Sequence, residues 1–185
     1  LLGVFPKGFA LDATHTPHVT MLQCFVRTED LDKGYAGEEN VLSSANVNAL
    51  RLEAFKFYYT TAGATGVAGI SAKPTPEILK LHVEISSAAK PFIVKTGSIG
   101  AFTASHEDPA IDVGIIDYVA TFVPKMSGEN FNPHVSIGVA TWAYLDQMVA
   151  APFEPFTFSP TGAAAYQLGR FGTAAKKLKE WDLQP

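Results

Sequence analysis

The order of strand-like and helix-like segments is the feature that most constrains the fold of this chain. A strand is expected over 50–60, because apolar and polar residues alternate over 50–57 (LRLEAFKF) as in a strand with one buried face. Further strands are expected at 17–26, 67–73, 92–96, 133–140, 153–158 and 163–168. Helix signals lie between these runs, and this mixture predicts an α+β or α/β fold.

The helix signals are hydroxyl caps followed by acidic or proline residues. Thr28, with Glu29 and Asp30 after it, predicts a helix that ends near Ala45. Thr75 precedes a proline, which is favoured in the first helical turn, so a second helix is expected over 76–90. Further helices are expected from Asp112 to Val123, from Thr141 past Met148, and from Thr173 to the lysines at 176, 177 and 179.

Composition favours one packed domain over 1–185. Of the 185 residues, 47% are hydrophobic and 17% are charged, so a core is easy to build and disorder is disfavoured. The formal net charge of -4 argues against a long nucleic acid held through many phosphates, but it allows a small anionic ligand in a local pocket. Cys24 is the single cysteine, which excludes an internal disulfide.

No apolar run approaches the length of a membrane span, so we expect a soluble protein without a membrane partner. The chain opens on Leu1, Leu2 and Gly3 without a methionine. A leader or a first strand could therefore have been removed, and the compartment stays open between cytoplasm and periplasm or secretion. A monomer is favoured.

One short phrase occurs twice in the chain. Residues 16–21 read TPHVTM and residues 132–137 read NPHVSI, each in an expected strand that a helix follows. Side chains two residues apart in a strand point to the same face. Each phrase therefore presents an imidazole beside a hydroxyl, His18 with Thr20 and His134 with Ser136, and the repeat hints at two similar halves.

Two imidazoles and two hydroxyls around one cleft suit a phosphodiester. An unprotonated imidazole can accept a proton from an attacking water or hydroxyl, and a protonated one can donate to the leaving oxygen. The ordinary pKa of histidine, about 6.5, makes both forms accessible near neutrality. The hydroxyls can donate hydrogen bonds to the phosphate oxygens, whose charge must be stabilised in the transition state. This scheme requires no metal and no cofactor.

The pair HVT at 18–20 and HVS at 134–136 resembles the signature of the 2H phosphoesterase superfamily. This superfamily includes cyclic nucleotide phosphodiesterases of tRNA splicing and 2′-5′ RNA ligase-like proteins. The tail AYQLGRFGTAAKKL (165–178) is similar to the end of a 2H subgroup, in which a strand and a glycine-containing turn precede a short helix. The resemblance is specific at the two triplets and moderate at the tail.

The resemblance implies an α+β fold of two lobes with pseudo-two-fold symmetry, each with an antiparallel sheet and outer helices, and a cleft between them. It implies metal-independent hydrolysis of 2′,3′-cyclic or 2′-5′ phosphodiesters of small nucleotides or oligonucleotides. His18 and His134 would form the acid–base pair, in either order, and Thr20 and Ser136 would bind the phosphate. The phrases lie farther apart than is common in the family, which predicts an insertion near 97–111 that shapes or covers the cleft.

Other residues are candidates for substrate contacts or for the core. Base stacking would need an aromatic face near the cleft, and Tyr166, Phe102 and Phe131 are candidates, with Tyr166 first because of its place in the tail. Arg170 and Lys56 could add positive charge near phosphate. His82 falls on the apolar face of its helix, which predicts a packed histidine. The loop 97–109 is either a lid or a plain surface loop, and the glycines of LGRFGT indicate a turn before a capped helix.

Two rival hypotheses use the same histidines. The pocket could hold a nucleotide or phosphate without turnover, because all four polar residues would be present in both cases. Alternatively, the histidines could ligate zinc, but neither phrase offers a third ligand and the paired hydroxyls would go unexplained. A second metal site, built from His106, Glu107 and Asp108, has no spacing that favours it.

Overall fold

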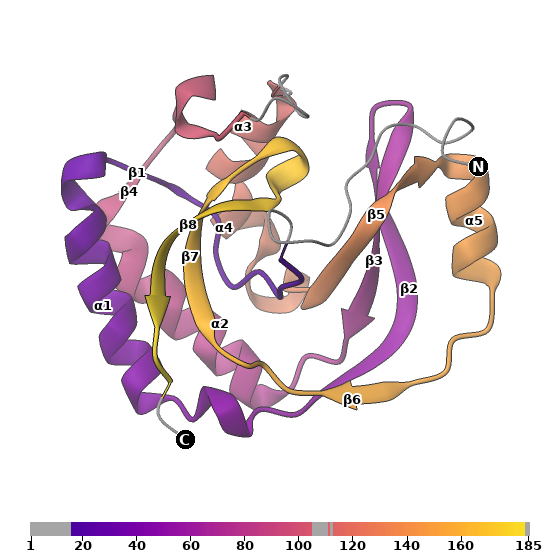
Figure 1. Cartoon of the computed structure of the whole chain (residues 1–185), viewed down its shortest axis with the longest axis horizontal. Helices are drawn as coiled ribbons and strands as arrows, with labels where there is room; N and C mark the ends of the chain where they lie inside the picture. Colours follow the sequence, from indigo (N-terminus) through magenta and orange to yellow (C-terminus); the bar gives the residue numbers. More distant parts are fainter. Residues whose placement is uncertain (1–15, 105–110, 112, 184–185) are drawn as a thin grey trace.

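The computed structural model describes residues 16–104, 111 and 113–183, and it shows an α+β protein (Figure 1). Its helices are α1 (Leu31–Ser44), α2 (Pro76–Ala89), α3 (Gly114–Ala120), α4 (Phe122–Met126) and α5 (Trp142–Ala150). Its strands are β1 (Phe25–Val26), β2 (Leu52–Ala62), β3 (Thr65–Ala72), β4 (Ile93–Val94), β5 (His134–Thr141), β6 (Phe156–Phe158), β7 (Ala163–Leu168) and β8 (Ala174–Trp181).

The largest sheet has the antiparallel order β5-β3-β2-β6. Its long hairpin β2–β3 turns at Gly63, whose positive φ of 58° favours glycine. Helix α5 lies along the outer side of this sheet (Figure 1), where the fully buried Leu145 packs against Ala68 and Ala140. The second histidine phrase begins β5, so this sheet positions His134 and Ser136.

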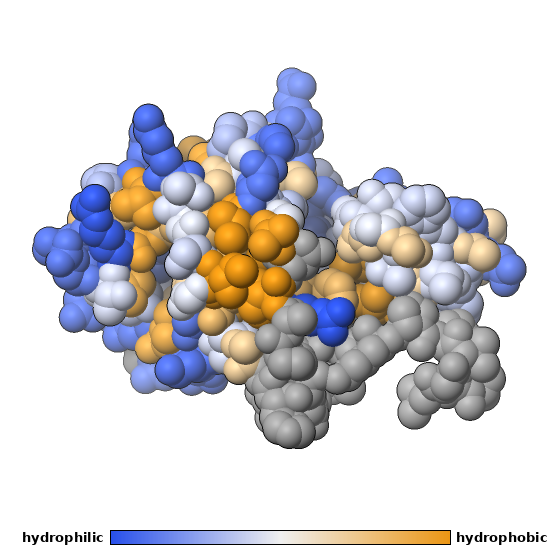
Figure 2. Space-filling model, turned by 90° about the horizontal axis from the view of Figure 1, so that it is seen from above, coloured by the Kyte–Doolittle hydropathy of each residue, from blue (hydrophilic) through white to orange (hydrophobic). Residues whose placement is uncertain are grey.

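The other half of the molecule packs α1 and α2 against the antiparallel hairpin β7–β8 (Figure 1). Leu42, Leu81 and Trp181 join these elements in one hydrophobic cluster. A separate cluster beneath α3 holds Phe25 and Phe102, whose rings meet edge to face at 5.8 Å. Seen from above, hydrophobic side chains gather over the part that carries α3, whereas the part with α5 and the β2–β3 hairpin is paler (Figure 2).

Most expected elements are confirmed, with shifted ends. Thr75 caps α2 by accepting a hydrogen bond from the Ile78 amide at 3.4 Å, and α1 and α5 also form. The helix expected over 112–123 is divided into α3 and α4, and Asp112 lies outside the described residues. The described strands make three antiparallel sheets instead of the two that the resemblance implied, because β1–β4 and β7–β8 pair separately.

The strand expected over 17–26 is largely wrong. Only Phe25–Val26 pairs with another strand, and residues 16–24 have no regular secondary structure. A strand needs a neighbouring backbone to complete its ladder. The carbonyl of Met21 instead accepts a hydrogen bond from the Nδ1 of His82 at 2.7 Å. A helix side chain therefore holds the segment that carries the first phrase.

The helix expected from Thr173 is wrong, and so is the corresponding part of the resemblance. Residues 174–181 form β8, which pairs with β7 in antiparallel register. The turn before it does form, with Phe171 and Gly172 at φ of 59° and 74°. Alanine and lysine favour helices locally, but pairing with β7 and burial of Trp181 override that preference.

In the part of the chain that the structure describes, no helix is long and apolar enough to cross a membrane.

Candidate active site

The two phrases hold their histidines by the same hydrogen bond. His18 Nδ1 lies 2.7 Å from the carbonyl oxygen of Thr16, and His134 Nδ1 lies 2.7 Å from that of Asn132. A carbonyl oxygen only accepts, so each Nδ1 carries the proton and donates it. Both imidazoles therefore leave Nε2 for other chemistry, and the repeat of letters is also a repeat of local geometry.

The shared proline gives this hydrogen bond a physical origin. In both phrases the accepting carbonyl belongs to the residue before the proline, two positions before the histidine. Proline fixes its own φ and pushes the residue before it into extended conformations. Each Pro-His pair thus restricts how the carbonyl and the imidazole approach each other. Pro133 is also fully buried, which anchors the second phrase.

The fold brings the two phrases together. Val19, between His18 and Thr20, packs against a cluster that includes Ala72 and Phe131. Ala72 donates its amide to the carbonyl of Pro133 at 2.8 Å, so the same cluster adjoins the start of the second phrase. His18 also lowers the pKa of His134, which requires the two imidazoles to be within electrostatic range.

Burial is the largest of the effects that shift the pKa of His134. It lowers the pKa of His134 below the ordinary 6.5, the hydrogen bond to Asn132 opposes this, and the nearby His18 lowers the pKa further. His134 therefore favours the unprotonated form near neutral pH, with Nε2 as an acceptor. An acceptor of this kind suits a general base.

The lowered pKa predicts how stability depends on pH. A folded-state pKa below the unfolded value means that His134 contributes its full stability above pH 6.5 and loses it as the pH falls through the folded pKa. Urea unfolding of wild type and His134→Gln at pH 8 and pH 5.5 measures this. We expect the stability difference between them to shift against the wild type at pH 5.5. A difference independent of pH would contradict the shift.

Both hydroxyl-bearing residues are half-buried, but only Ser136 lies in a strand as predicted. Ser136 shares the face of β5 with His134, and it lies opposite Gly69 in β3. Thr20 follows His18 in the segment without regular structure. The same cross-strand rows continue into β2, where Lys56 lies opposite Ser71 and Tyr58 lies opposite Gly69. Lys56 is exposed and its Nζ lies 5.2 Å from the Phe55 ring, so it adds a cation to the sheet that carries His134.

The residues predicted to contact a base lie in different environments. Phe102 and Phe131 are only 8% and 6% exposed and belong to hydrophobic clusters, so neither offers a free ring face. Tyr166 is half-buried in β7, opposite Lys177. The guanidinium of Arg170 lies 4.7 Å from the ring centre of Phe171. Of the predicted loop 97–109, residues 105–109 lie outside the described residues, and these include His106, Glu107 and Asp108.

His82 is buried, as predicted, and supports the first phrase. It is 1% exposed and stacks on Phe131 with ring centres 4.0 Å apart. Its Nδ1 bonds to Met21, and its Nε2 lies 3.1 Å from the hydroxyl oxygen of Ser127. This histidine therefore joins α2, the first phrase and the turn before β5.

Sequence reasoning missed Tyr58. Its ring lies edge to face with the imidazole of His134, with centres 4.8 Å apart. Burial, followed by the nearby Tyr118, holds the pKa of its hydroxyl well above the ordinary value, so the phenol stays protonated at neutral pH. The strand expected over 50–60 includes Tyr58, but only the sheet register places it beside the second phrase.

Cys24 is no candidate for a nucleophile. Burial, with a smaller effect of Glu38, raises the pKa of its thiol to about 12. The reactive form of cysteine is the thiolate, which is scarce at such a pKa. Glu38 itself has a pKa raised to about 7 by burial.

The described ranges contain no group of three or more histidine, cysteine or carboxylate side chains able to hold a metal ion.

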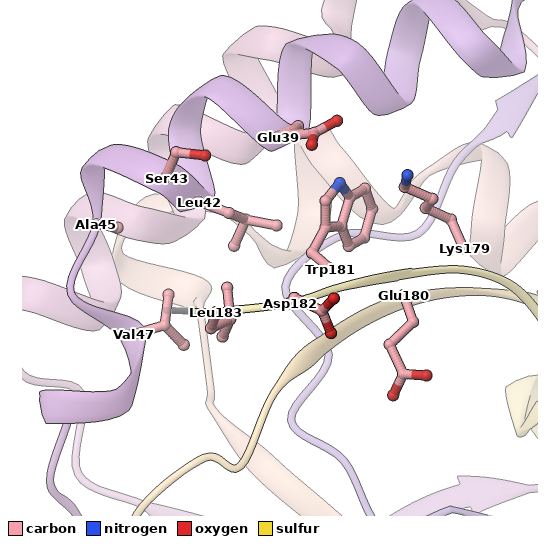
Figure 3. A pocket seen from close by; sticks show the side chains of 10 residues that line it. All are labelled: Glu39, Leu42, Ser43, Ala45, Val47, Lys179, Glu180, Trp181, Asp182 and Leu183. Carbon is pink, nitrogen blue, oxygen red and sulfur yellow. The ribbon is translucent and has the colours of Figure 1, made fainter. Parts of the chain in front are cut away.

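Two hollows lie away from the histidine phrases. One, of about 290 Å³, lies between α1 and β8, where Trp181 extends toward the helix among Glu39, Lys179 and Asp182 (Figure 3). The other, of about 440 Å³, is mainly apolar and lies between α2, β4 and the α3–α4 segment. His82 and Ser127 line the second, so it adjoins the residues that support the first phrase.

Comparison with known protein families and with curated proteins found no match to this chain.

Proposed function

We propose that this protein is a 2H-type phosphodiesterase that hydrolyses small 2′,3′-cyclic or 2′-5′ nucleotide phosphodiesters without a metal. The observation that carries the proposal is the matched pair of imidazoles. Each is held through Nδ1 by the carbonyl two residues upstream at 2.7 Å, and each has a hydroxyl two residues downstream. A packed core histidine needs no such repeat.

The proposed reaction assigns different roles to the two imidazoles. His134, whose pKa burial lowers, accepts a proton from the attacking water through Nε2. The water oxygen forms a bond to phosphorus while the bond to the leaving ribose oxygen breaks. His18 donates a proton to that leaving oxygen, so the products are a phosphomonoester and a free hydroxyl. Thr20 and Ser136 hydrogen-bond to the non-bridging oxygens as charge develops there.

Hydrolysis of 2′,3′-cyclic nucleoside monophosphates in the presence of EDTA tests the proposal. We expect turnover that EDTA does not reduce and a bell-shaped dependence of kcat/KM on pH, because one imidazole must be unprotonated and the other protonated. Phosphorus NMR of the product identifies which phosphoester bond is cleaved. Loss of turnover on chelation would contradict the proposal.

A non-catalytic nucleotide-binding module is the second candidate, because the same four side chains would serve it. The lowered pKa of His134 argues for catalysis, since an imidazolium would hold a phosphate more strongly than an unprotonated imidazole. Tight binding without turnover over a panel of cyclic mononucleotides and 2′-5′ oligonucleotides would favour the binding module.

A further inference from the structure

Tyr58 reaches His134 across an intervening strand. Tyr58 is in β2 and His134 is in β5, and β3 runs between them. Two strand spacings amount to roughly 9.6 Å, so contact requires that both side chains extend over the middle strand. The ring centres are nevertheless only 4.8 Å apart, with the planes inclined by 66°.

Small residues in the middle strand make this contact possible. On the face shared with His134 and Ser136, β3 contributes Gly69 and Ser71. The Tyr58 ring lies directly over Gly69, where an added Cβ would fall 2.2 Å from its Cε1 atom. Such a distance is far inside van der Waals contact, so any side chain at position 69 would displace the ring. Glycine is thus required here by a close approach.

We propose that Tyr58 is a positioning residue for His134: its ring fixes the plane of the imidazole, so that Nε2 stays directed at the substrate. The hydrogen bond to Asn132 restrains Nδ1 but still allows the ring to tilt about it, and the edge-to-face contact with Tyr58 removes that freedom. The catalytic consequence rests on the proposed function, whereas the effect on the imidazole does not.

The aromatic ring, not the hydroxyl, carries this role. Tyr58→Phe retains the ring and is expected to keep kcat within about threefold of wild type. Tyr58→Leu removes it and is expected to lower kcat by roughly 10- to 100-fold with little change in KM, as for a misplaced catalytic group. Gly69→Ala should cause the same loss, because it displaces the Tyr58 ring without replacing that residue. Gly138→Ala in β5 is the matched control, because no atom lies within 4 Å of its added Cβ.

Nuclear magnetic resonance of histidine labelled with ¹³C and ¹⁵N reads the position of His134 without any assay of activity. Tyr58→Leu and Gly69→Ala should move its ring resonances and shift its titration midpoint upward toward 6.5, because water replaces the ring. Tyr58→Phe and Gly138→Ala should leave both unchanged. If Tyr58→Leu does not fold, Tyr58→Met fills a similar volume without a ring, and it is expected to move the ring resonances of His134 in the same way.

The kinetic measurement and the NMR measurement test the proposed function and the role of Tyr58 separately. The positioning role would be overturned, whatever the activity, if the ring resonances and titration midpoint of His134 kept their wild-type values in Tyr58→Leu and Gly69→Ala. An inactive wild type would contradict the proposed function, while the resonances would still decide the role of Tyr58. Equal loss of kcat in Tyr58→Phe and Tyr58→Leu would also overturn the inference, since it would assign the effect to the hydroxyl.

Discussion

Replacing either His18 or His134 with alanine should abolish most of the hydrolysis of 2′,3′-cyclic nucleotides. General acid and general base roles are each typically worth roughly 10²–10⁴-fold in rate, so we expect kcat/KM to fall by that factor in each variant. The two imidazoles act in one step, so the double variant should lose far less than the product of the two factors. Steady-state kinetics of the three variants at matched pH measure this.

The pH profiles of the single variants identify the roles. His134→Ala removes the proposed base, so the acidic limb of the bell should disappear while the alkaline limb remains. His18→Ala should show the reverse. Thermal unfolding of each variant controls for loss of fold, because both side chains are partly buried. Residual activity near wild type in either folded variant would contradict the two-histidine mechanism.

Among the substitutions described above, His82→Ala should cause the largest decrease in the free energy of unfolding. The side chain is 1% exposed, stacks on Phe131 and contacts Met21 and Ser127. Its removal leaves a cavity and deprives the partly buried Met21 carbonyl of its donor, so we expect the free energy of unfolding to fall by about 3 kcal/mol. Urea unfolding followed by circular dichroism measures this.

Val83→Ala is the control on the same helix, because Val83 is 55% exposed and should change stability by less than about 0.5 kcal/mol. At urea concentrations below its unfolding midpoint, where the variant is still folded, His82→Ala should also have lower hydrolytic activity. The reason is that His82 binds the segment that carries His18. A loss of stability no greater than that of Val83→Ala would show that these contacts contribute little.

The parts of the fold that were predictable are those with strong local signals. The cap at Thr75 with its following proline determined where α2 begins, and alternation over 50–57 identified β2. The buried character of His82 followed from its helical face. The candidate site was also predictable as far as its four polar residues, because both phrases carry the histidine and the hydroxyl within three residues. Their functional roles stay predictions.

The errors arose where local preference and tertiary pairing disagree. Residues 174–181 carry alanine and lysine, which favour a helix, yet they form β8 because β7 offers a strand to pair with. The sequence of residues 17–24 is typical of a strand, yet the carbonyl of Met21 accepts a hydrogen bond from the His82 side chain and not from a neighbouring strand. Phe102 and Phe131 have the ring chemistry for stacking, but the clusters around them cover both rings.

The sequence alone therefore determined the chemical groups of the candidate site, because each phrase carries a histidine and a hydroxyl within three residues. Tertiary structure decided everything that depends on contacts distant in sequence. It brought His18 near His134, lowered the pKa of His134 by burial, and laid Tyr58 over Gly69. These effects depend on which strands are neighbours and in what register, and no local pattern specifies either.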